Sequence, residues 1–269
     1  MQKLRIGFVV NNLIVGGVSK VLISLCNSLD INKYDIYIFI LSNDTQMEKY
    51  IQLNSNVNRY IFNYSFKNSY TSISYLKSAF LKSDTKIRAK KIIEGITKFK
   101  LDVLHFHTLP RQLPIGQLIL KKNPKIKLIF TDHSVRISAI EYKTHQKFLL
   151  KIAYSRFYKN FNIIAVSKKV YNSITQNNLN DASKKIKILE NSISISDYNR
   201  TKKIDTNSFI YISRITDQKG HRTLINAWKS IKNKEKGTLY IIGPDESNGA
   251  IIQLAENDKT IVLQVAFQI

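Results

Sequence analysis

Three histidines stand close to the ends of two short apolar segments of the chain. His105 and His107 flank Phe106, and alternate spacing in an extended segment places both imidazoles on one face. His133 follows the next apolar segment. Imidazole serves as a general acid or base, a hydrogen-bond partner or a metal ligand. The pattern fits the polar lining of a cleft, a set of structural histidines or a zinc site. Because no carboxylate pair or supporting hydrogen-bonding pattern accompanies the histidines, no metal is predicted.

Two cationic residues lie in the polar stretch 213–220, between an apolar segment and a helical pattern. Arg214 and Lys219 precede Gly220 in this stretch. Arginine offers a planar fork of donors and lysine a compact point charge, and this combination suits a diphosphate. The alternative is that the stretch is a solvated loop without a ligand.

A pair of glycines, Gly16 and Gly17, lies between the first apolar segment and the first helical pattern. Glycines at such a turn let backbone N–H groups approach an anion, and the helix N-terminus adds positive potential. The turn lacks the further glycines of a dinucleotide-binding fingerprint and the lysine of a Walker A loop. It is therefore either a phosphate-binding loop or a tight connection between a strand and a helix.

Apolar segments that alternate with helical patterns must position these side chains. The alternation predicts βαβ units, an α/β fold and a parallel sheet covered on both faces. In such a sheet the ligand crevice borders the carboxyl ends of the strands, where the residues above stand. The expected strands are 4–10, 35–41, 58–62, 102–106, 127–131, 162–166 and 186–189, followed by 209–213, 238–242 and 260–265.

Two domains are predicted from this series. Residues 1–190 supply seven strands and form a complete Rossmann-like domain, 191–207 are polar and form a linker, and 208–269 form a second domain. The second domain supplies three strands, where a doubly wound sheet commonly has five or six. We therefore expect it to be incomplete.

The charge of the chain is strongly basic and unevenly distributed. The formal net charge is +23 for 269 residues, and residues 1–200 carry +20 of it. Basic residues recur among apolar ones over 77–100 and among aromatic ones over 142–169. Such helices suit an anionic membrane surface, and the alternative is a general abundance of lysine on solvated faces. No zinc-finger spacing, aromatic RNA-recognition motif or helix-turn-helix appears, so no nucleic-acid partner is predicted.

Other classes of protein are excluded by composition. No apolar run approaches the about 20 residues of a membrane span, and Asn11 and Asn12 interrupt the first one before any cleavage site of a signal peptide. Cys26 is the only cysteine, in an apolar helical stripe, which favours a packed thiol and a cytoplasmic location. A dehydrogenase of the Rossmann type is disfavoured, because no acidic residue ends the second strand.

The order of these motifs along the chain resembles glycosyltransferase family 4, whose members have the GT-B fold. The resemblance implies a retaining transfer of a hexosyl or N-acetylhexosaminyl group from a nucleotide-sugar donor to an acceptor, without metal or other cofactor. The residues that carry it are Gly16-Gly17, His105-Phe106-His107, Thr131-Asp132-His133, Ile164-Ala165-Val166-Ser167, Glu190-Asn191-Ser192-Ile193, Ser213-Arg214, Gln218-Lys219-Gly220 and Ile241-Ile242-Gly243-Pro244.

The resemblance also implies roles for residues of this chain. Gly16 and Gly17 would lie against the donor diphosphate, Arg214 and Lys219 would bind it, and His133 would contact the donor sugar at the reacting centre as the catalytic residue. Lesser expectations place His105 and His107 in the acceptor cleft.

One family feature is missing from the residues present. The Glu-x7-Glu segment that holds the donor sugar and ribose would lie beyond residue 269, so the chain is expected to be C-terminally truncated. Two hypotheses stand. The chain transfers a sugar to a lipid-linked or cell-surface glycan precursor, peripherally at the inner face of the membrane, or it is an inactive remnant or a membrane-surface or glycan-binding module.

Overall fold

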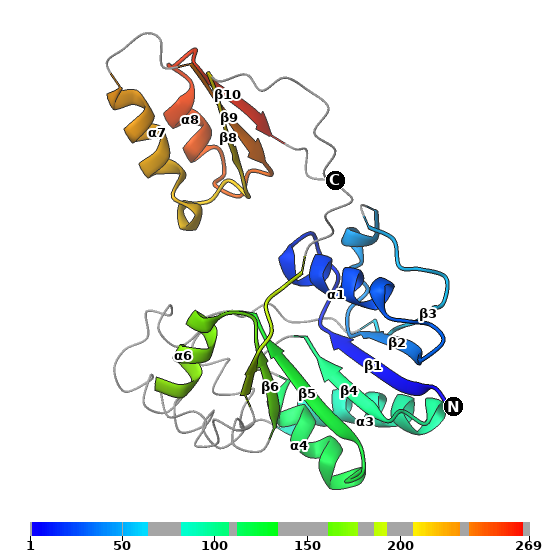
Figure 1. Ribbon diagram of the computed structural model, residues 1–269. Helices are drawn as coiled ribbons and strands as arrows, with labels where there is room; N and C mark the ends of the chain where they lie inside the picture. Colours follow the sequence, from blue (N-terminus) through cyan, green and yellow to red (C-terminus); the bar gives the residue numbers. More distant parts are fainter. Residues whose placement is uncertain are drawn as a thin grey trace. The chain divides into compact units, whose positions relative to one another are not determined.

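The computed structural model describes residues 2–49, 51–63, 82–107, 112–133, 161–176, 186–192, 207–231 and 237–265. The chain divides into two compact units, Met1–Ile193 and Ser194–Ile269. The division falls within the predicted linker 191–207, of which 193–206 lie outside the described residues. Figure 1 shows the elements of both units.

A parallel sheet of seven strands forms the centre of the first unit. The strand order is β3-β2-β1-β4-β5-β6-β7, and every pair in it is parallel. The central strands are short apolar runs rich in valine, isoleucine and phenylalanine, as expected when both faces are covered. The strands are β1 (Leu4–Val10), β2 (Tyr34–Ile40), β3 (Val57–Ile61), β4 (Val103–Phe106), β5 (Lys127–Asp132), β6 (Asn162–Ala165) and β7 (Ile186–Ile188).

Helices cover both faces of this sheet. Helix α1 (Gly17–Ser28) lies on one face, and α3 (Lys82–Phe99) and α4 (Leu113–Lys122) lie on the other (Figure 1). Helix α6 (Lys168–Gln176) follows β6, and the single turn η1 (Gln46–Lys49) follows β2. Each face has its own apolar core, so residues that alternate along one strand belong to different cores.

Helix α3 shows how the sequence sets both the face and the end of a helix. Ala89, Ile92 and Ile96 recur at helical spacing and are buried against the sheet. Lys100 follows the helix with a positive φ of 51°, which turns the chain back. The N–H of Leu101 then donates to the carbonyl of Ile96 at 3.1 Å, and the N–H of Lys100 donates to the carbonyl of Thr97 at 3.3 Å. This is a Schellman-type ending, and it delivers the chain directly into β4.

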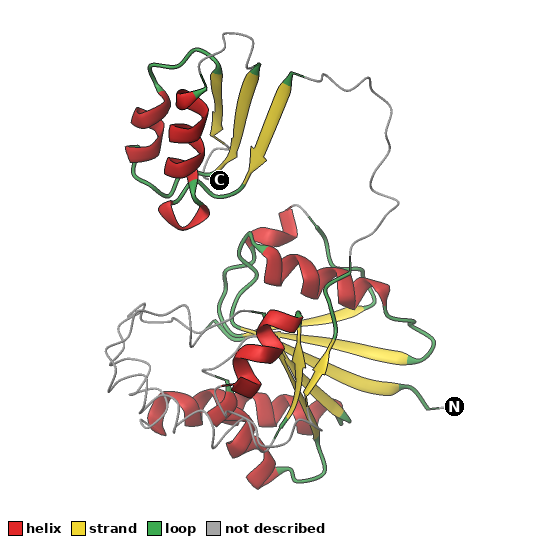
Figure 2. Cartoon of the chain, turned by 60° about the vertical axis from the view of Figure 1, so that its left-hand side comes forward, coloured by secondary structure: helices red, strands yellow, loops and turns green. Residues whose placement is uncertain are grey.

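A smaller parallel sheet forms the second unit, with the order β10-β9-β8. Helices α7 and α8 lie side by side on one face of it (Figure 2), which follows from two right-handed crossovers that move in the same direction. Trp228 closes the core and donates from Nε1 to Thr260 Oγ1 at 3.0 Å. The elements are β8 (Ser208–Ile212), η4 (Asp217–Lys219), α7 (His221–Ser230), β9 (Thr238–Gly243), α8 (Ala250–Ala255) and β10 (Ile261–Val265).

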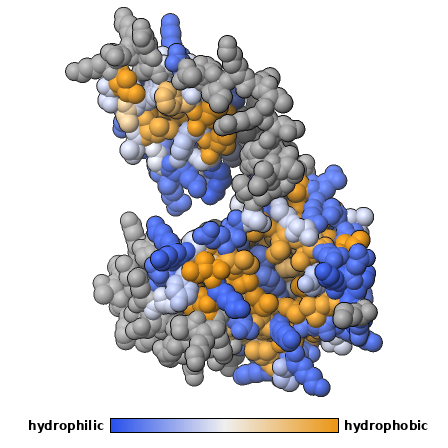
Figure 3. All heavy atoms as spheres, viewed as in Figure 1, coloured by the Kyte–Doolittle hydropathy of each residue, from blue (hydrophilic) through white to orange (hydrophobic). Residues whose placement is uncertain are grey.

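Apolar side chains also lie on the surface of the second unit. Ile210 and Ile212 of β8 are exposed, as is Phe209, whose ring meets Trp228 edge-on with centroids 5.4 Å apart. In Figure 3 apolar surface is interleaved with hydrophilic surface on this unit. Among the described residues, no helix covers the face of the sheet that carries Ile210 and Ile212.

The predicted α/β fold class is confirmed by the two parallel sheets that the described residues form. Cys26 is buried as predicted, and burial raises the pKa of its thiol to about 12. No helix among the described residues is long and apolar enough to cross a membrane. Of the predicted basic segments, 82–100 and 168–169 are described, and 77–81 and 142–159 lie outside the described residues.

Candidate functional site

The first unit has a topological switch point between β1 and β4. Strand β1 pairs with β2 on one side and with β4 on the other, so the connections leaving β1 and β4 diverge. Helix α1 follows β1 on one face of the sheet, and α4 follows β4 on the other. In open α/β sheets a ligand binds in the crevice that such divergence leaves at the carboxyl ends of the strands.

The glycine turn after β1 lies at this switch point. Gly16 is the residue before helix α1, its backbone is extended, and no side chain caps the helix N-terminus. A Cβ atom added at Gly16 or Gly17 would meet no described atom within 4 Å. Neither glycine is therefore required by packing or by a positive φ. The open space lies where the first N–H groups of a helix attract an anion.

The three predicted histidines lie together at the carboxyl ends of β4 and β5. The ring centroids of His105 and His107 are 4.3 Å apart, and those of His107 and His133 are 5.5 Å apart. His105 Nε2 lies 2.7 Å from Thr131 Oγ1, and His107 Nδ1 lies 3.4 Å from His133 Nε2. Phe8 of β1 packs against both His105 and His107. We call His105, His107 and His133 the histidine cluster.

The buried members of the histidine cluster are electrically neutral. His105 is 8% exposed and His107 is 2% exposed. Burial, together with the charge of His133, lowers the pKa of His105 to about 3. Burial also lowers the pKa of His107 well below its ordinary value, and the charges of His105 and His133 add to the effect. Both imidazoles are thus uncharged near neutral pH and offer one donor and one acceptor each.

A polar bridge crosses the switch point beside the cluster. Gln112, at the start of α4, donates from Nε2 to Asn11 Oδ1 after β1 at 3.1 Å. Within the described residues, Gln112 Oε1 and His107 Nε2 are buried and have no hydrogen-bond partner. Buried polar atoms without partners are costly, so they mark a place where water or a ligand supplies the missing contact.

The predicted cations of the second unit lie in the loop 213–220, which connects β8 to α7. We call this stretch the cation loop. Arg214 Nη1 contacts both carboxylate oxygens of Glu246, at 2.8 and 3.0 Å. Lys219 ends the short turn η4 and accepts a hydrogen bond at its carbonyl from the hydroxyl of Tyr211. Gly220 then adopts a left-handed φ of 74°, which lets α7 begin at once.

The buried side chain of His221 forms hydrogen bonds to the cation loop. His221 has no exposed surface, and its Nδ1 donates to the carbonyl of Thr216 at 2.9 Å. Its Nε2 lies 3.3 Å from the hydroxyl of Ser213. The loop is thereby attached at two points to the first residue of α7.

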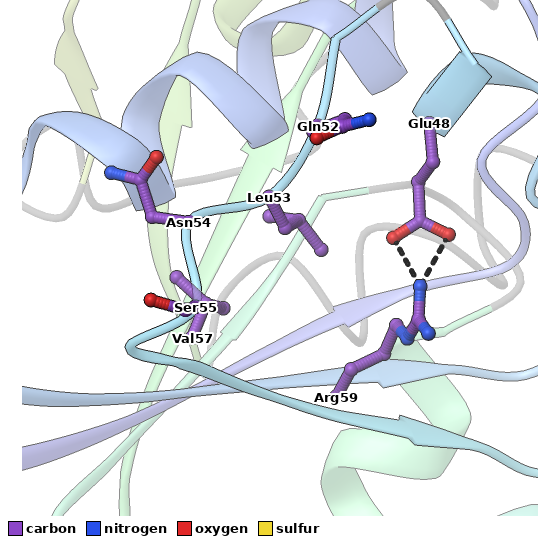
Figure 4. A pocket seen from close by; sticks show the side chains of 7 residues that line it. All are labelled: Glu48, Gln52, Leu53, Asn54, Ser55, Val57 and Arg59. Atoms are coloured by element: carbon purple, nitrogen blue, oxygen red, sulfur yellow. Dashed lines mark hydrogen bonds and ion pairs between the residues drawn. The ribbon is translucent and has the colours of Figure 1, made fainter.

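No group of three or more His, Cys, Asp and Glu in the described part of the chain is arranged to hold a metal ion. A pocket of about 590 Å³ lies elsewhere in the first unit, around the loop before β3. In Figure 4, Arg59 reaches Glu48 across this pocket, with Nη1 at 2.7 and 2.8 Å from the two carboxylate oxygens. A second pocket, of about 480 Å³, is lined by residues of β4 to β7. Neither includes the histidine cluster.

The sequence located the chemistry-bearing residues and missed their partners. His105, His107 and His133 are brought together, Gly16 and Gly17 begin a helix at the switch point, and Arg214 and Lys219 share one loop. The missed partners are Asn11, Gln112, Thr131, His221 and Glu246. Asn11, Thr131 and Glu246 lie at or within four residues of the predicted strand ends 10, 131 and 242, which was the available signal for them. Gln112 and His221 lie instead at the observed starts of α4 and α7.

Solved structures with this architecture include several glycosyltransferases. Anabaena HepE in complex with UDP and glucose aligns with a TM-score of 0.66 at 13% identity, over 97% of this chain and 68% of that one. A glycosyltransferase from Rickettsia africae gives 0.70 at 18% identity, over 100% of this chain and 69% of that one. Sucrose-phosphate synthase from Thermosynechococcus elongatus gives 0.71 at 12%, over 98% and 71%. These likenesses show the GT-B fold.

Comparison of the sequence with protein families identifies the family of the chain. No curated protein matches the sequence. A model of Glycosyltransferase Family 4 matches residues 15–197, a range that begins just before the glycine turn and includes the whole histidine cluster. Because this range is more than half of the chain, the chain belongs to glycosyltransferase family 4.

Proposed function

We propose that the chain binds a nucleotide sugar and transfers the sugar to a glycan precursor that is lipid-linked or belongs to the cell surface. Family membership and the fold support sugar transfer from a nucleotide-sugar donor. The observation that carries the proposal is the glycine turn. Two glycines that the protein's own packing does not require leave open the space at the N-terminus of α1, where a phosphate is stabilised.

The charged residues supply the chemistry of the leaving group. As the glycosidic bond breaks, negative charge develops on the departing nucleoside diphosphate. Arg214 and Lys219 stabilise that charge, and fixed cations of this kind make a large contribution to catalysis. His133 contacts the donor sugar at the reacting centre. Neither a metal nor another cofactor takes part.

The neutral histidines suit the uncharged part of the reaction. A buried imidazole that remains uncharged donates and accepts hydrogen bonds without attracting counter-ions. His105 and His107 are both buried, and Thr131 holds His105 at Nε2. We place the acceptor hydroxyl near these two residues, because a hydroxyl offers the complementary donor and acceptor.

Calorimetric titration of the whole chain with UDP, UDP-glucose and UDP-N-acetylglucosamine tests the proposal. UDP is the nucleotide bound in the HepE structure and is therefore the first probe. We expect measurable binding, weakened about tenfold or more in Arg214→Ala and in Lys219→Ala, because each loses a charge-assisted contact with phosphate. Absence of heat with these and with the corresponding GDP and ADP sugars would contradict donor binding.

A patch on the first unit supports a membrane-surface acceptor. Lys98 lies over the rings of Phe99 and Tyr60, at 5.3 and 6.0 Å from their centroids, and Lys91 lies 5.9 Å from that of Phe62. Basic side chains interleaved with aromatic rings are typical of proteins that bind an anionic lipid surface.

Vesicle flotation tests this part separately. We expect the chain to float with vesicles that contain anionic lipid, less so at high salt, and Lys91→Gln combined with Lys98→Gln to reduce the bound fraction. Equal binding to neutral vesicles would contradict the membrane proposal and leave donor binding unaffected. A chain that binds both donor and vesicles but forms no product would favour the non-catalytic binding module.

A further inference from the structure

The loops that follow β8 and β9 in the second unit are joined beyond the end of the sheet. The N–H of Ser213 donates to the carbonyl of Ile242 at 3.0 Å, and that of Ile215 to the carbonyl of Pro244 at 2.8 Å. The N–H of Glu246 donates back to Ile215 at 3.0 Å. The cation loop and the loop 244–249 therefore hold one another by their backbones, independently of any side chain.

Gly243 makes this junction possible. Its φ is 155°, and a Cβ atom at this position would lie 1.9 Å from the carbonyl oxygen of Ser213. Only a residue without a side chain allows the two loops to approach so closely. The approach sets the distance between the residues that follow, which are Arg214 on one loop and Glu246 on the other.

The carboxylate of Asp245 fixes the turn on which Glu246 stands. It accepts hydrogen bonds from the hydroxyl and the N–H of Ser247 and from the N–H of Gly249, at 2.6 to 2.8 Å. Hydrogen bonds from Ser247 and Gly249 hold the pKa of Asp245 below its ordinary value, so the carboxylate keeps its charge. The position of Glu246 is thus determined on both sides, by Asp245 and by the backbone bond to Ile215.

The contact between Glu246 and Arg214 occupies one nitrogen of the guanidinium group. Both carboxylate oxygens approach Nη1, at 2.8 and 3.0 Å. A guanidinium group carries five N–H donors in a fixed plane, so the edge formed by Nε and Nη2 remains outside this contact. That edge has the geometry that binds two oxygens of a phosphate at once.

We propose that Glu246 is a positioning residue for Arg214: it holds Nη1 so that the Nε–Nη2 edge of the guanidinium faces the donor diphosphate. The inference rests on the proposed function, since it concerns the same diphosphate. Both side chains are about half exposed, and an exposed pair contributes little to stability. A carboxylate beside a phosphate site also repels the phosphate, so this placement favours binding only through the orientation that it gives to Arg214.

A double-mutant cycle on UDP affinity separates orientation from the other roles of Glu246. We expect Glu246→Ala to weaken UDP binding about five- to tenfold, and Glu246→Gln to weaken it less, because the amide oxygen still accepts one hydrogen bond. In an Arg214→Ala background, Glu246→Ala should cause no further loss of affinity, because only the repulsion between the carboxylate and the phosphate is then removed. Glu48→Ala is the matched control, because both carboxylate oxygens of Glu48 approach Nη1 of Arg59, as those of Glu246 approach Nη1 of Arg214.

The outcomes distinguish this inference from the proposed function. Tighter or unchanged UDP binding by Glu246→Ala overturns the inference, since the carboxylate then competes with the ligand or ignores it. An equal loss in the presence and absence of Arg214 also overturns it, because Glu246 then acts without the arginine. A wild-type chain that binds no UDP overturns the proposed function and this inference together. Thermal unfolding followed by Trp228 fluorescence verifies that each variant keeps the second unit folded.

Discussion

The strand ends of the two units use opposite electrostatic designs. In the first unit His105 and His107 are buried and neutral, with His107 at 2% exposure, whereas in the second Arg214 is charged and open, with its side chain 53% exposed. Burial penalises charge, and exposure to solvent preserves it. Under the proposed function, the neutral imidazoles of the first unit would meet uncharged hydroxyls, and the cations of the second unit would meet the diphosphate that also approaches the glycine turn.

The largest expected effect concerns Gly243, a glycine that the close approach of two backbones requires. Gly243→Ala forces a Cβ atom against the Ser213 carbonyl, so we expect the second unit to lose about 3 kcal/mol or more of its free energy of unfolding. Urea unfolding followed by the fluorescence of Trp228, the only tryptophan, measures this loss. Gly249→Ala is the control: its φ is also positive, at 81°, but nothing lies within 4 Å, so it should cost only about 1 kcal/mol.

The second prediction tests the neutrality of the histidine cluster by pH. Folded His105 has a pKa of about 3, against an ordinary value of 6.5, so the unfolded chain binds an extra proton between these values. Stability is therefore complete above pH 6.5 and is lost as the pH falls below it, by about 1.4 kcal/mol per pH unit. His107, whose pKa is also lowered, acts in the same direction.

Urea unfolding of the first unit at pH 7 and pH 5, followed by far-ultraviolet circular dichroism, measures the pH effect. For His105 alone we expect a loss of about 2 kcal/mol between the two conditions. His105→Gln should show a shallower dependence than the wild type, because one of the protons is no longer taken up on unfolding. Identical slopes for the two proteins would show that His105 is charged in the folded state.

Gly17→Ala is expected to lower ligand affinity without lowering stability, which is the opposite of the effect on stability expected for Gly243→Ala. The added methyl group meets no described atom within 4 Å, and alanine favours helix, so stability should stay the same or rise by up to about 1 kcal/mol. The methyl group stands where phosphate would approach the N–H groups of α1, so UDP affinity should fall about tenfold. Unchanged affinity measured by calorimetry would move the diphosphate away from this turn.

The smallest expected effect concerns the Arg59–Glu48 pair. It matches the Arg214–Glu246 pair in geometry but lies at a pocket that no predicted ligand residue lines. Because the arginine is half exposed, Glu48→Ala should lower the free energy of unfolding by about 1 kcal/mol or less. Nucleotide affinity should not change. A loss of UDP binding would show that the two pairs do not differ in function.

Most of the fold follows from local pattern. Each strand in the described part of the chain was predicted with limits within one residue, because short apolar runs between helical patterns admit few other structures. Parallel pairing also follows, since strands that alternate with helices are joined by crossover connections, but the order β3-β2-β1-β4-β5-β6-β7 was not predicted. The predicted basic segment 77–100 is confirmed as helical over Lys82–Phe99.

The site was predictable only in part, because its partners come from distant positions. Gln112 reaches Asn11 across 101 positions of sequence, and Glu246 reaches Arg214 across 32. No local sequence pattern encodes such pairings. They depend on the order and register of the strands, which became known only with the structure. Residue type alone also left the charge of His105 undetermined, because burial decides it.

The attachment of the cation loop to His221 has a consequence for the rate of ligand capture. Because Thr216 and Ser213 are both tied to a buried ring, the backbone between them has little freedom to lose when an anion arrives. Binding that needs no ordering step retains more of its interaction energy and proceeds close to the rate of encounter. Under the proposed function, the second unit would therefore associate rapidly with the donor diphosphate, and added salt would lower the affinity chiefly by slowing association.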